Sequence, residues 1–352
     1  MSRNVNYTST PWKQNYCEII DVRSPAEFAE DAYPGAVNLP VLNDDERAKV
    51  GTIYKQVSAF EARKVGASLI SRNISQHLSQ HFASKDKQYS PLIYCWRGGQ
   101  RSNSLAIILT QIGWQTTVLE GGYKTYRAYV RQQLATLPQR FCYRILSGLT
   151  GTGKTHILQQ MANNNQQVLD LEALANHRGS LLGQVWQEQP QAQPSQKKFE
   201  TLLLQKLSSF EESRSVWVES ESNKIGNVYL PKILWQKMKD SASVEVKVPL
   251  EARVQWLLEQ YPEWVANPGI LKQKLALLKS RHGTQKLTQW FGWIDQGNFA
   301  ELVADLLLTH YDPAYHKSLI NTFQSVDCSL LLENFSPDSI ADFQRSLNQL
   351  FE

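Results

Sequence analysis

The chain has 352 residues, of which 42% are hydrophobic and 20% charged, a balance typical of folded, soluble domains. This length suits two domains, each with its own core. No run of about eighteen apolar residues occurs and the N-terminus lacks an apolar core, so neither a transmembrane helix nor a secretion signal is predicted. Four scattered cysteines without a CxxC pair favour a reducing, cytoplasmic location.

The formal net charge of +4 is unevenly distributed along the chain. Residues 1–140 hold 17 Lys and Arg against 11 Asp and Glu, whereas residues 141–352 hold 20 against 22. The basic N-terminal part favours an anionic partner. An excess of six positive charges over 140 residues is common, so it does not by itself identify the partner.

The first part of the chain alternates between strands and helices. Residues 17–22 (CEIIDV) and 91–96 (PLIYCW) are apolar runs typical of buried parallel strands. Ser24 and Glu27 have the spacing of a capping box at a helix start. Three more elements are expected: a turn and short strand at 33–40, a helix at 100–112 and a strand at 116–123. This alternation predicts an α/β sheet.

A second alternation follows a polar, helical connector at 124–140. Residues 141–161 predict a strand, a glycine-rich loop and a helix. Further strands are expected at 166–174 and 213–221, with a Pro- and Gln-rich loop at 188–198. From about residue 250 the pattern becomes mainly helical, with amphipathic pieces.

The stretch GLTGTGKT fits the phosphate-binding pattern G-x-x-x-x-G-K-[ST]. Glycines let consecutive backbone N–H groups converge on phosphate oxygens, and the following helix directs its N-terminal dipole at the same anion. Lys154 can reach terminal phosphates and the Thr155 hydroxyl can ligate Mg²⁺. A glycine-rich turn without a ligand is the alternative. The predicted phosphate-binding residues are Gly148, Thr150, Gly151, Thr152, Gly153, Lys154 and Thr155.

A magnesium-binding carboxylate should end a later strand. Glu219, after SVWV, is the first candidate, and Asp170, at the end of QVLDL, is the second. Either residue could instead cap a helix or lie on the surface. Together with Thr155 they form the expected Mg²⁺ site, and no tightly bound metal is expected.

Cys95 ends an apolar strand just before a helix. A loop at that position presents several N–H donors and feels the helix dipole, and both effects stabilise a thiolate. The sequence therefore predicts a nucleophilic sulfur beside an anion cradle. The alternative, a small buried apolar residue, is our interpretation of Cys17, Cys142 and Cys328. The predicted anion-binding loop consists of Arg97, Gly98, Gly99, Gln100, Arg101 and Ser102.

The stretch IIDVRSPAEFAEDAYPGAVNLP, with YCWRGGQRS and VLEGGY, resembles a rhodanese domain, a sulfurtransferase module. One departure matters. Common rhodaneses have four residues between the cysteine and the final loop arginine, whereas this chain has five between Cys95 and Arg101. The longer spacing resembles rhodanese-related phosphatases and arsenate reductases. A wider loop suits a larger tetrahedral anion than thiosulfate chemistry requires.

A rhodanese-like domain fused to a P-loop domain resembles the bacterial tRNA 2-selenouridine synthase family. The stretches LDLEALANHRGS, VWVESESNKIG and HYDPAY are similar to motifs of that family. The expected division is an N-terminal extension at 1–11, a rhodanese-like domain at 12–135, and a P-loop NTPase-like α/β domain with added helices at 136–352.

The resemblance implies a transferase that converts 2-thiouridine at the tRNA wobble position to 2-selenouridine. It implies geranylation of the sulfur by geranyl diphosphate, then exchange for selenium from selenophosphate, with Cys95 carrying selenium. The implied partners are this tRNA and a selenophosphate synthetase, with no membrane. On this basis the P-loop is expected to grip the prenyl diphosphate, with Mg²⁺ on Thr155, rather than ATP.

Aromatic and basic side chains offer material for binding RNA. WFGW, at 290–293, could stack a base or line a geranyl pocket, although burial in the core is the first expectation. Lys197 and Lys198 could meet phosphates, although a solvated pair is the default.

Three other functions stay open at the level of sequence. The chain could be a nucleotide-dependent kinase or NTPase acting on tRNA, with a regulatory rhodanese module. It could be a rhodanese-type sulfur relay whose Cys95 hands persulfide onward. It could also be a phosphatase that uses the C-x5-R loop, although that function would leave the P-loop half of the chain unexplained.

Overall fold

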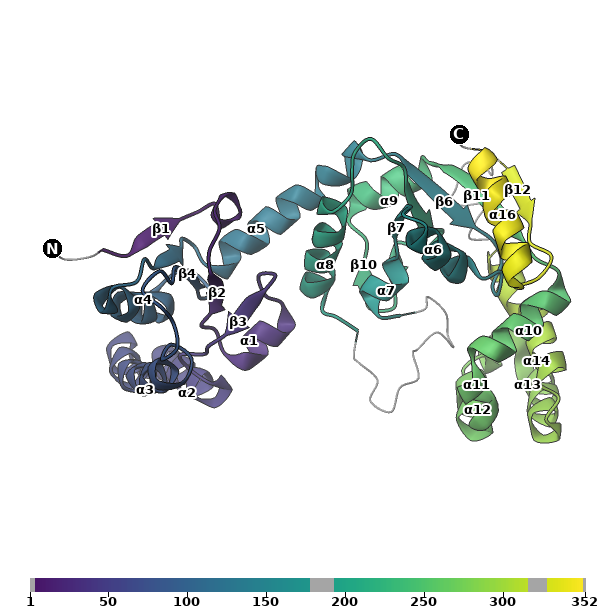
Figure 1. The fold of residues 1–352 in the computed structure, drawn as a ribbon. Coiled ribbons are helices and arrows are strands. Elements are labelled where there is room, and N and C mark those ends of the chain that lie inside the picture. Colours follow the sequence, from purple (N-terminus) through teal and green to yellow (C-terminus); the bar gives the residue numbers. More distant parts are fainter. Residues whose placement is uncertain (1–3, 178–192, 316–327, 351–352) are drawn as a thin grey trace. The chain divides into compact units, whose positions relative to one another are not determined.

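The computed structural model describes residues 4–177, 193–315 and 328–350 (Figure 1). The chain divides into two compact units. The first holds residues 1–133 with 194–204, and the second holds 134–193 with 205–352. Among the described residues, no helix is both long enough and apolar enough to cross a bilayer.

The first unit is built on a five-stranded parallel sheet with the strand order β1-β5-β4-β2-β3. Its central strand β4 is buried along its whole length, as its unbroken apolar sequence predicts. The strands are β1 (Asn6–Thr8), β2 (Glu18–Asp21), β3 (Ala36–Asn38), β4 (Pro91–Tyr94) and β5 (Thr117–Leu119). The predicted strands at 17–22, 33–40, 91–96 and 116–123 are therefore confirmed, with shorter bounds.

Helices alternate with the strands of this sheet along the chain. Helix α4 has the predicted bounds, and the capping box predicted at Ser24 and Glu27 is present at the start of α1. The long pair α2 and α3 was not predicted. The helices are η1 (Pro11–Lys13), α1 (Pro25–Glu30), α2 (Asp44–Gln56), α3 (Ala59–Gln80), α4 (Gln100–Ile112) and α5 (Tyr123–Leu134).

A later segment of the chain completes the first unit. Residues 194–204, which include the first part of α8 (Gln196–Ser208), belong to it. The Thr201 hydroxyl donates to Asp31 at 3.1 Å, and the Tyr123 hydroxyl donates to the same carboxylate oxygen at 2.8 Å. Residues that follow the phosphate-binding motif in sequence are thus part of the first unit.

The second unit has another five-stranded parallel sheet, with the order β12-β11-β6-β8-β7. Helix α6 packs on β7 and β8, and α9 packs on β6. Strands β11 and β12 were not predicted. The strands are β6 (Tyr143–Ser147), β7 (Gln167–Leu169), β8 (Val216–Glu219), β11 (Ala242–Lys247) and β12 (Cys328–Leu331), and a small hairpin pairs β9 (Lys224–Ile225) with β10 (Val228–Tyr229).

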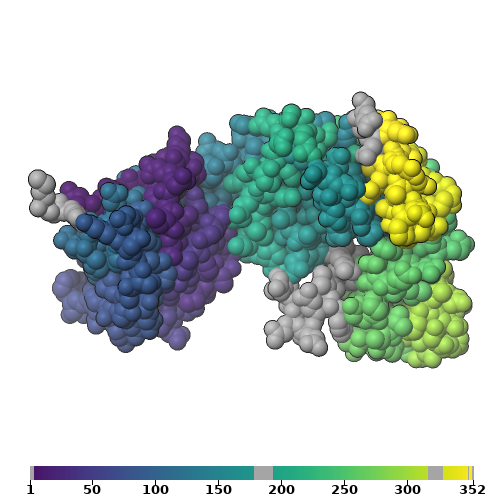
Figure 2. Space-filling view, viewed as in Figure 1, coloured from purple at the N-terminus to yellow at the C-terminus, as the bar shows by residue number. Residues whose placement is uncertain are grey.

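Most helices of the second unit follow residue 250, as predicted. Figure 2 shows the surface of the earlier of these helices in green, directly beside the C-terminal segment, which holds α16, in yellow. Earlier in the chain lie η2 (Leu137–Arg140), α6 (Lys154–Asn163), α7 (Leu171–Ala175) and α9 (Lys232–Lys239). The later helices are α10 (Leu250–Gln260), α11 (Pro262–Ala266), α12 (Pro268–Ala276), α13 (Lys279–Gln296), α14 (Phe299–Leu306), η3 (Leu307–Tyr311) and α16 (Pro337–Gln349).

The WFGW stretch lies on α13, in a core of its own. Trp290 is fully buried, and its indole N–H donates to Asp305 at 2.7 Å. Phe291 and Trp293 pack against the same hydrophobic cluster. Burial in the core, the first expectation for this stretch, is confirmed for Trp290, whereas Phe291 and Trp293 are half-buried. The α/β class with two parallel sheets and added helices is confirmed as well.

Candidate functional site

Cys95 directly follows β4, at the edge where the parallel strands end. The next four residues form a tight loop, and α4 begins at Gln100. Gly98 has a φ of +63°, and a Cβ atom there would lie 2.6 Å from the Leu119 carbonyl oxygen. The loop can therefore take this path only with glycine at that position. Gly99 and Arg97 are exposed beside it.

The sulfur of Cys95 is held at the start of α4. Cys95 is only 3% exposed, and its Sγ lies 3.3 Å from the Ser102 Oγ. The Ser102 hydroxyl can also donate to the Gly99 carbonyl at 3.1 Å. Because unpaired N–H groups and the helix dipole favour negative charge there, an anion bound beside the sulfur is stabilised. The sequence prediction placed Cys95, Gly99 and Ser102 together, and the structure does the same.

Arg101 has a carboxylate partner in the structure. Its Nη1 lies 2.7 Å from Glu27, whose other role is to accept from the Ser24 N–H at 3.1 Å. Burial would raise the pKa of the Glu27 carboxyl, but the hydrogen bond and charge of Arg101 outweigh it and hold that pKa below its usual range. The capping glutamate thus fixes the end of the loop, while Arg97 faces solvent.

A second turn clamps the cysteine loop from the other side. The N–H groups of Tyr123 and Lys124 donate to the carbonyls of Cys95, at 2.8 Å, and of Trp96, at 3.2 Å. Gly122 has a φ of +59°, and a Cβ atom there would lie 2.2 Å from the Cys95 carbonyl oxygen. The VLEGGY stretch is therefore part of the cysteine site.

Lys197 lies beside this site but pairs with a carboxylate. Its Nζ is 2.6 Å from Glu30 and 5.6 Å from the ring centre of Trp96. Lys198 is half-buried, and its backbone N–H donates to Ser195. Both residues end the predicted loop at 188–198, of which residues 188–192 lie outside the described part of the chain. The loop prediction is wrong for residues 196–198, which form the start of α8.

The phosphate-binding motif forms the turn between β6 and α6, as predicted. Gly153 has a φ of +68°, and α6 begins at Lys154. The Lys154 ammonium donates to the Gly148 carbonyl at 2.9 Å and lies 3.5 Å from Glu219. Burial would lower the pKa of Lys154, but nearby carboxylates, Glu219 first, outweigh it and raise the pKa. A full positive charge is therefore kept at the loop.

Residues from the C-terminal helices support the loop backbone. Arg253 donates from Nε to the Thr150 carbonyl at 2.9 Å, and its guanidinium forms a buried, bidentate pair with Asp312 at 2.6 and 3.0 Å. The Gly148 N–H donates to the Tyr315 hydroxyl at 2.9 Å. Asp312 and Tyr315 belong to HYDPAY, which the sequence singled out without showing why. Their role is to fix the phosphate-binding loop.

Three carboxylates gather beside Thr155. Ligand oxygens of Glu172, Glu219 and Glu221 lie within 4.8 Å of one another. The Thr155 hydroxyl donates to Glu219 at 3.0 Å. Asp170 is outside this cluster, because its carboxylate caps α7 by accepting from the Ala173 N–H at 2.8 Å.

This acidic cluster could hold a divalent cation, since carboxylate and hydroxyl oxygens suit Mg²⁺. Burial and the neighbouring carboxylates, Glu219 first, raise the pKa of Glu172 to about 9 and that of Glu221 to about 7. Sequence reasoning missed both residues, although they lie in the quoted stretches at 169–180 and 216–226. Residues 178–180 of the first stretch lie outside the described residues.

Two family models match the chain. A rhodanese-like domain matches residues 9–129, and a tRNA 2-selenouridine synthase AAA domain matches residues 141–289. A tRNA 2-selenouridine synthase of Hydrogenovibrio crunogenus is 32% identical over 355 residues, which cover 92% of this chain and 94% of that protein. The chain belongs to the tRNA 2-selenouridine synthase family.

Other members of the tRNA 2-selenouridine synthase family match a shorter part of the chain. The enzyme of Nitrosomonas europaea is 38% identical over 247 residues, which cover 69% of this chain and 63% of that protein. The one of Sulfurovum sp. is 36% identical over 248 residues, which cover 70% of this chain and 66% of that protein. The match therefore spans slightly less than two thirds of these two relatives.

Substituting Gly122 by alanine tests the clamp on the cysteine loop. The positive φ alone costs about 1–2 kcal/mol, and the clash with the Cys95 carbonyl adds to it. Gly35 is the matched control, because it has a φ of +74° and nothing within 4 Å of an added Cβ. We expect urea denaturation to show a larger loss for Gly122→Ala than for Gly35→Ala, and faster alkylation of Cys95 in Gly122→Ala only. Equal losses with unchanged alkylation would contradict the clamp.

Substituting Glu221 by glutamine tests the repulsion within the acidic cluster. The pKa of Glu221 is raised in the folded state, so its contribution to stability is present below about pH 4.5 and is lost as the pH rises through about 7. Glutamine mimics the protonated form. In EDTA, thermal denaturation of Glu221→Gln should match wild type near pH 4.5 and show a gain of about 1 kcal/mol at pH 8. The exposed Glu259→Gln should show no such difference. An equal gain at both pH values would refute the raised pKa.

Proposed function

We propose that this chain is a tRNA-modifying transferase that converts wobble 2-thiouridine to 2-selenouridine by way of S-geranyl-2-thiouridine. One observation carries the proposal above all: a cysteine held at a helix N-terminus and a phosphate cradle occur in one chain of this family. The substrates would be the 2-thiouridine tRNA, geranyl diphosphate, and selenophosphate made by a selenophosphate synthetase. The reaction would take place in the cytoplasm.

In the first step, the thiocarbonyl sulfur of the nucleoside attacks C1 of the geranyl group. A C–S bond forms as the C–O bond to the diphosphate breaks, the N3 proton of the base passes to solvent, and the negative charge grows on the leaving diphosphate. Lys154 and the N–H groups at the start of α6 suit that charge. Mg²⁺ on Thr155 and Glu219 would neutralise part of it.

In the second step, selenium replaces sulfur at C2 of the base. Geranylation makes the sulfur a leaving group. The selenium of selenophosphate attacks C2, a C–Se bond forms, and the C–S bond at C2 breaks with release of geranylthiol. Water then cleaves the Se–P bond, so phosphate leaves and selenium stays on C2. Selenophosphate is a tetrahedral anion, and the wide loop from Cys95 to Ser102 offers backbone N–H groups and Arg97 to such a ligand. Cys95 is the residue on which we expect this selenium step to depend.

The rival function is a nucleotide-dependent kinase or NTPase, since a phosphate-binding loop also suits ATP. It requires nucleotide turnover. Under our proposal, hydrolysis of ATP by the purified chain is not stimulated by tRNA.

Replacing Cys95 by serine separates the two steps. The variant should lose 2-selenouridine to below about 1% of wild type, as expected when an essential nucleophile is removed, and should accumulate S-geranyl-2-thiouridine. Nucleoside mass spectrometry of tRNA from a complemented deletion strain, grown with selenium, measures both products. Cys142→Ser, at an exposed cysteine, should behave as wild type. Normal 2-selenouridine in the Cys95→Ser strain would overturn the assignment.

A further inference from the structure

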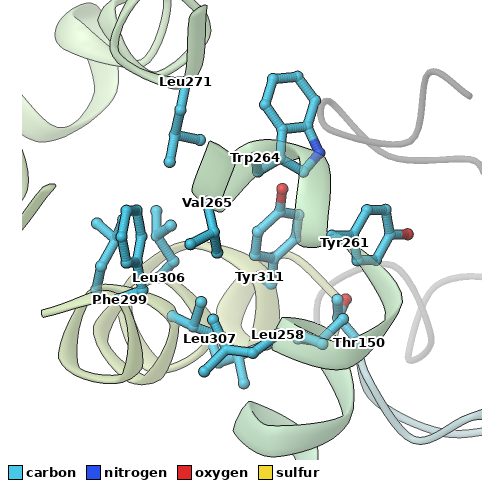
Figure 3. Close-up of a pocket in the computed structure, with 13 residues that line it drawn as sticks. Thr150, Leu258, Tyr261, Trp264, Val265, Leu271, Phe299, Leu306, Leu307 and Tyr311 are labelled. Atoms are coloured by element: carbon cyan, nitrogen blue, oxygen red, sulfur yellow. The ribbon is translucent and has the colours of Figure 1, made fainter. Parts of the chain in front are cut away.

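A cavity in the second unit lies beside the phosphate-binding loop (Figure 3). Thr150 of that loop stands at its edge, and α10, α11, α12, α14 and η3 supply the other walls. Nine of its thirteen lining side chains are pure hydrocarbon, all of them leucine, valine or phenylalanine. Val265, at 39% exposed, marks where the cavity meets solvent.

The same elements fix the position of the cavity wall relative to the phosphate-binding loop. Helix α10 carries Arg253, which binds the Thr150 carbonyl, and one turn later Leu257, which lines the cavity. A Cβ atom on Gly151 would lie 2.9 Å from Leu257 Cδ1, so the loop backbone rests on that wall. Tyr311 lines the cavity, and the next residue, Asp312, pairs with Arg253.

A ligand that occupies both the phosphate-binding loop and the cavity must carry phosphate at one end and hydrocarbon at the other. A purine or pyrimidine base has several hydrogen-bonding atoms that would be buried without partners against leucine and valine, at a cost in affinity. An acyclic isoprenoid chain has none, and its burial is favourable. We propose that this cavity holds the isoprenoid tail of the prenyl diphosphate whose head group lies in the phosphate-binding loop. This inference rests on the proposed function and adds to it the place of the tail.

Filling the cavity should weaken binding of the tail and leave binding of the head group unchanged. Val303→Trp places an indole in the cavity, and Val265→Trp does so from an exposed position, where folding is not at stake. Ala266→Trp is the matched control, since Ala266 is exposed on the same helix as Val265 and does not line the cavity. Isothermal titration with geranyl diphosphate, inorganic pyrophosphate and ATP is the measurement.

Both cavity variants should bind geranyl diphosphate at least about tenfold more weakly than wild type and bind pyrophosphate within about twofold of it. Ala266→Trp should bind both ligands as wild type does. Unchanged geranyl diphosphate affinity in both cavity variants would overturn the inference. So would a parallel loss of pyrophosphate, or an ATP affinity that exceeds that for geranyl diphosphate and falls in the cavity variants.

Lys154→Ala distinguishes this inference from the function on which it rests. If Lys154→Ala binds geranyl diphosphate as tightly as wild type, the assignment of the phosphate-binding loop fails, and the proposed first step fails with it. If Lys154→Ala weakens binding of geranyl diphosphate and the cavity variants do not, only the proposal that the tail lies in this cavity is refuted.

Discussion

Unpaired backbone N–H groups at the start of two helices are the constraint on which both candidate sites depend. A helix that follows a buried parallel strand presents these donors at the edge where the strands end, and burial there calls for a partner of negative charge. Helix α4 presents them beside Cys95, and α6 presents them beside Lys154. Both units thus favour an anion at this point, one beside a sulfur nucleophile and the other beside a lysine ammonium.

Both loops are held by residues that lie far away in the sequence. The cysteine loop depends on Gly122 and on the pair of Arg101 with Glu27. The phosphate-binding loop depends on Arg253, which is itself held by Asp312. The buried Arg253 donates both to the Thr150 carbonyl and to the Asp312 carboxylate. Removing either member of the ion pair would leave the other charge buried without compensation. Pre-organisation of this kind lets a loop bind an anion without first paying to order itself.

The loop positions could be predicted from sequence because each depends on local chemistry. Glycines at Gly98 and Gly153 take positive φ values, and the flanking strand and helix patterns are strong. Partners across the fold could not be predicted, because the pattern of one segment does not tell which distant segment it meets. Glu172 joins Glu219 and Glu221 only when β7 and β8 lie side by side. Asp170, predicted as a candidate ligand, instead caps α7.

Other elements escaped prediction for physical reasons as well. The exposed faces of α2 and α3 are rich in charged and polar residues, so their apolar periodicity is weak. Strand β12 alternates between half-buried and exposed positions at the edge of its sheet. The share of α8 in the first unit follows from tertiary packing around Asp31. No local pattern encodes that contact.

The central claim is that one chain captures two anions at separate sites and uses them one after the other. Its most direct test gives the Lys154→Ala variant selenophosphate and RNA that already contains S-geranyl-2-thiouridine, and measures 2-selenouridine by mass spectrometry. We predict formation at the wild-type rate, while the same variant fails on 2-thiouridine RNA supplied with geranyl diphosphate. An equal defect on the geranylated RNA would contradict the account, since the two sites would then not act separately.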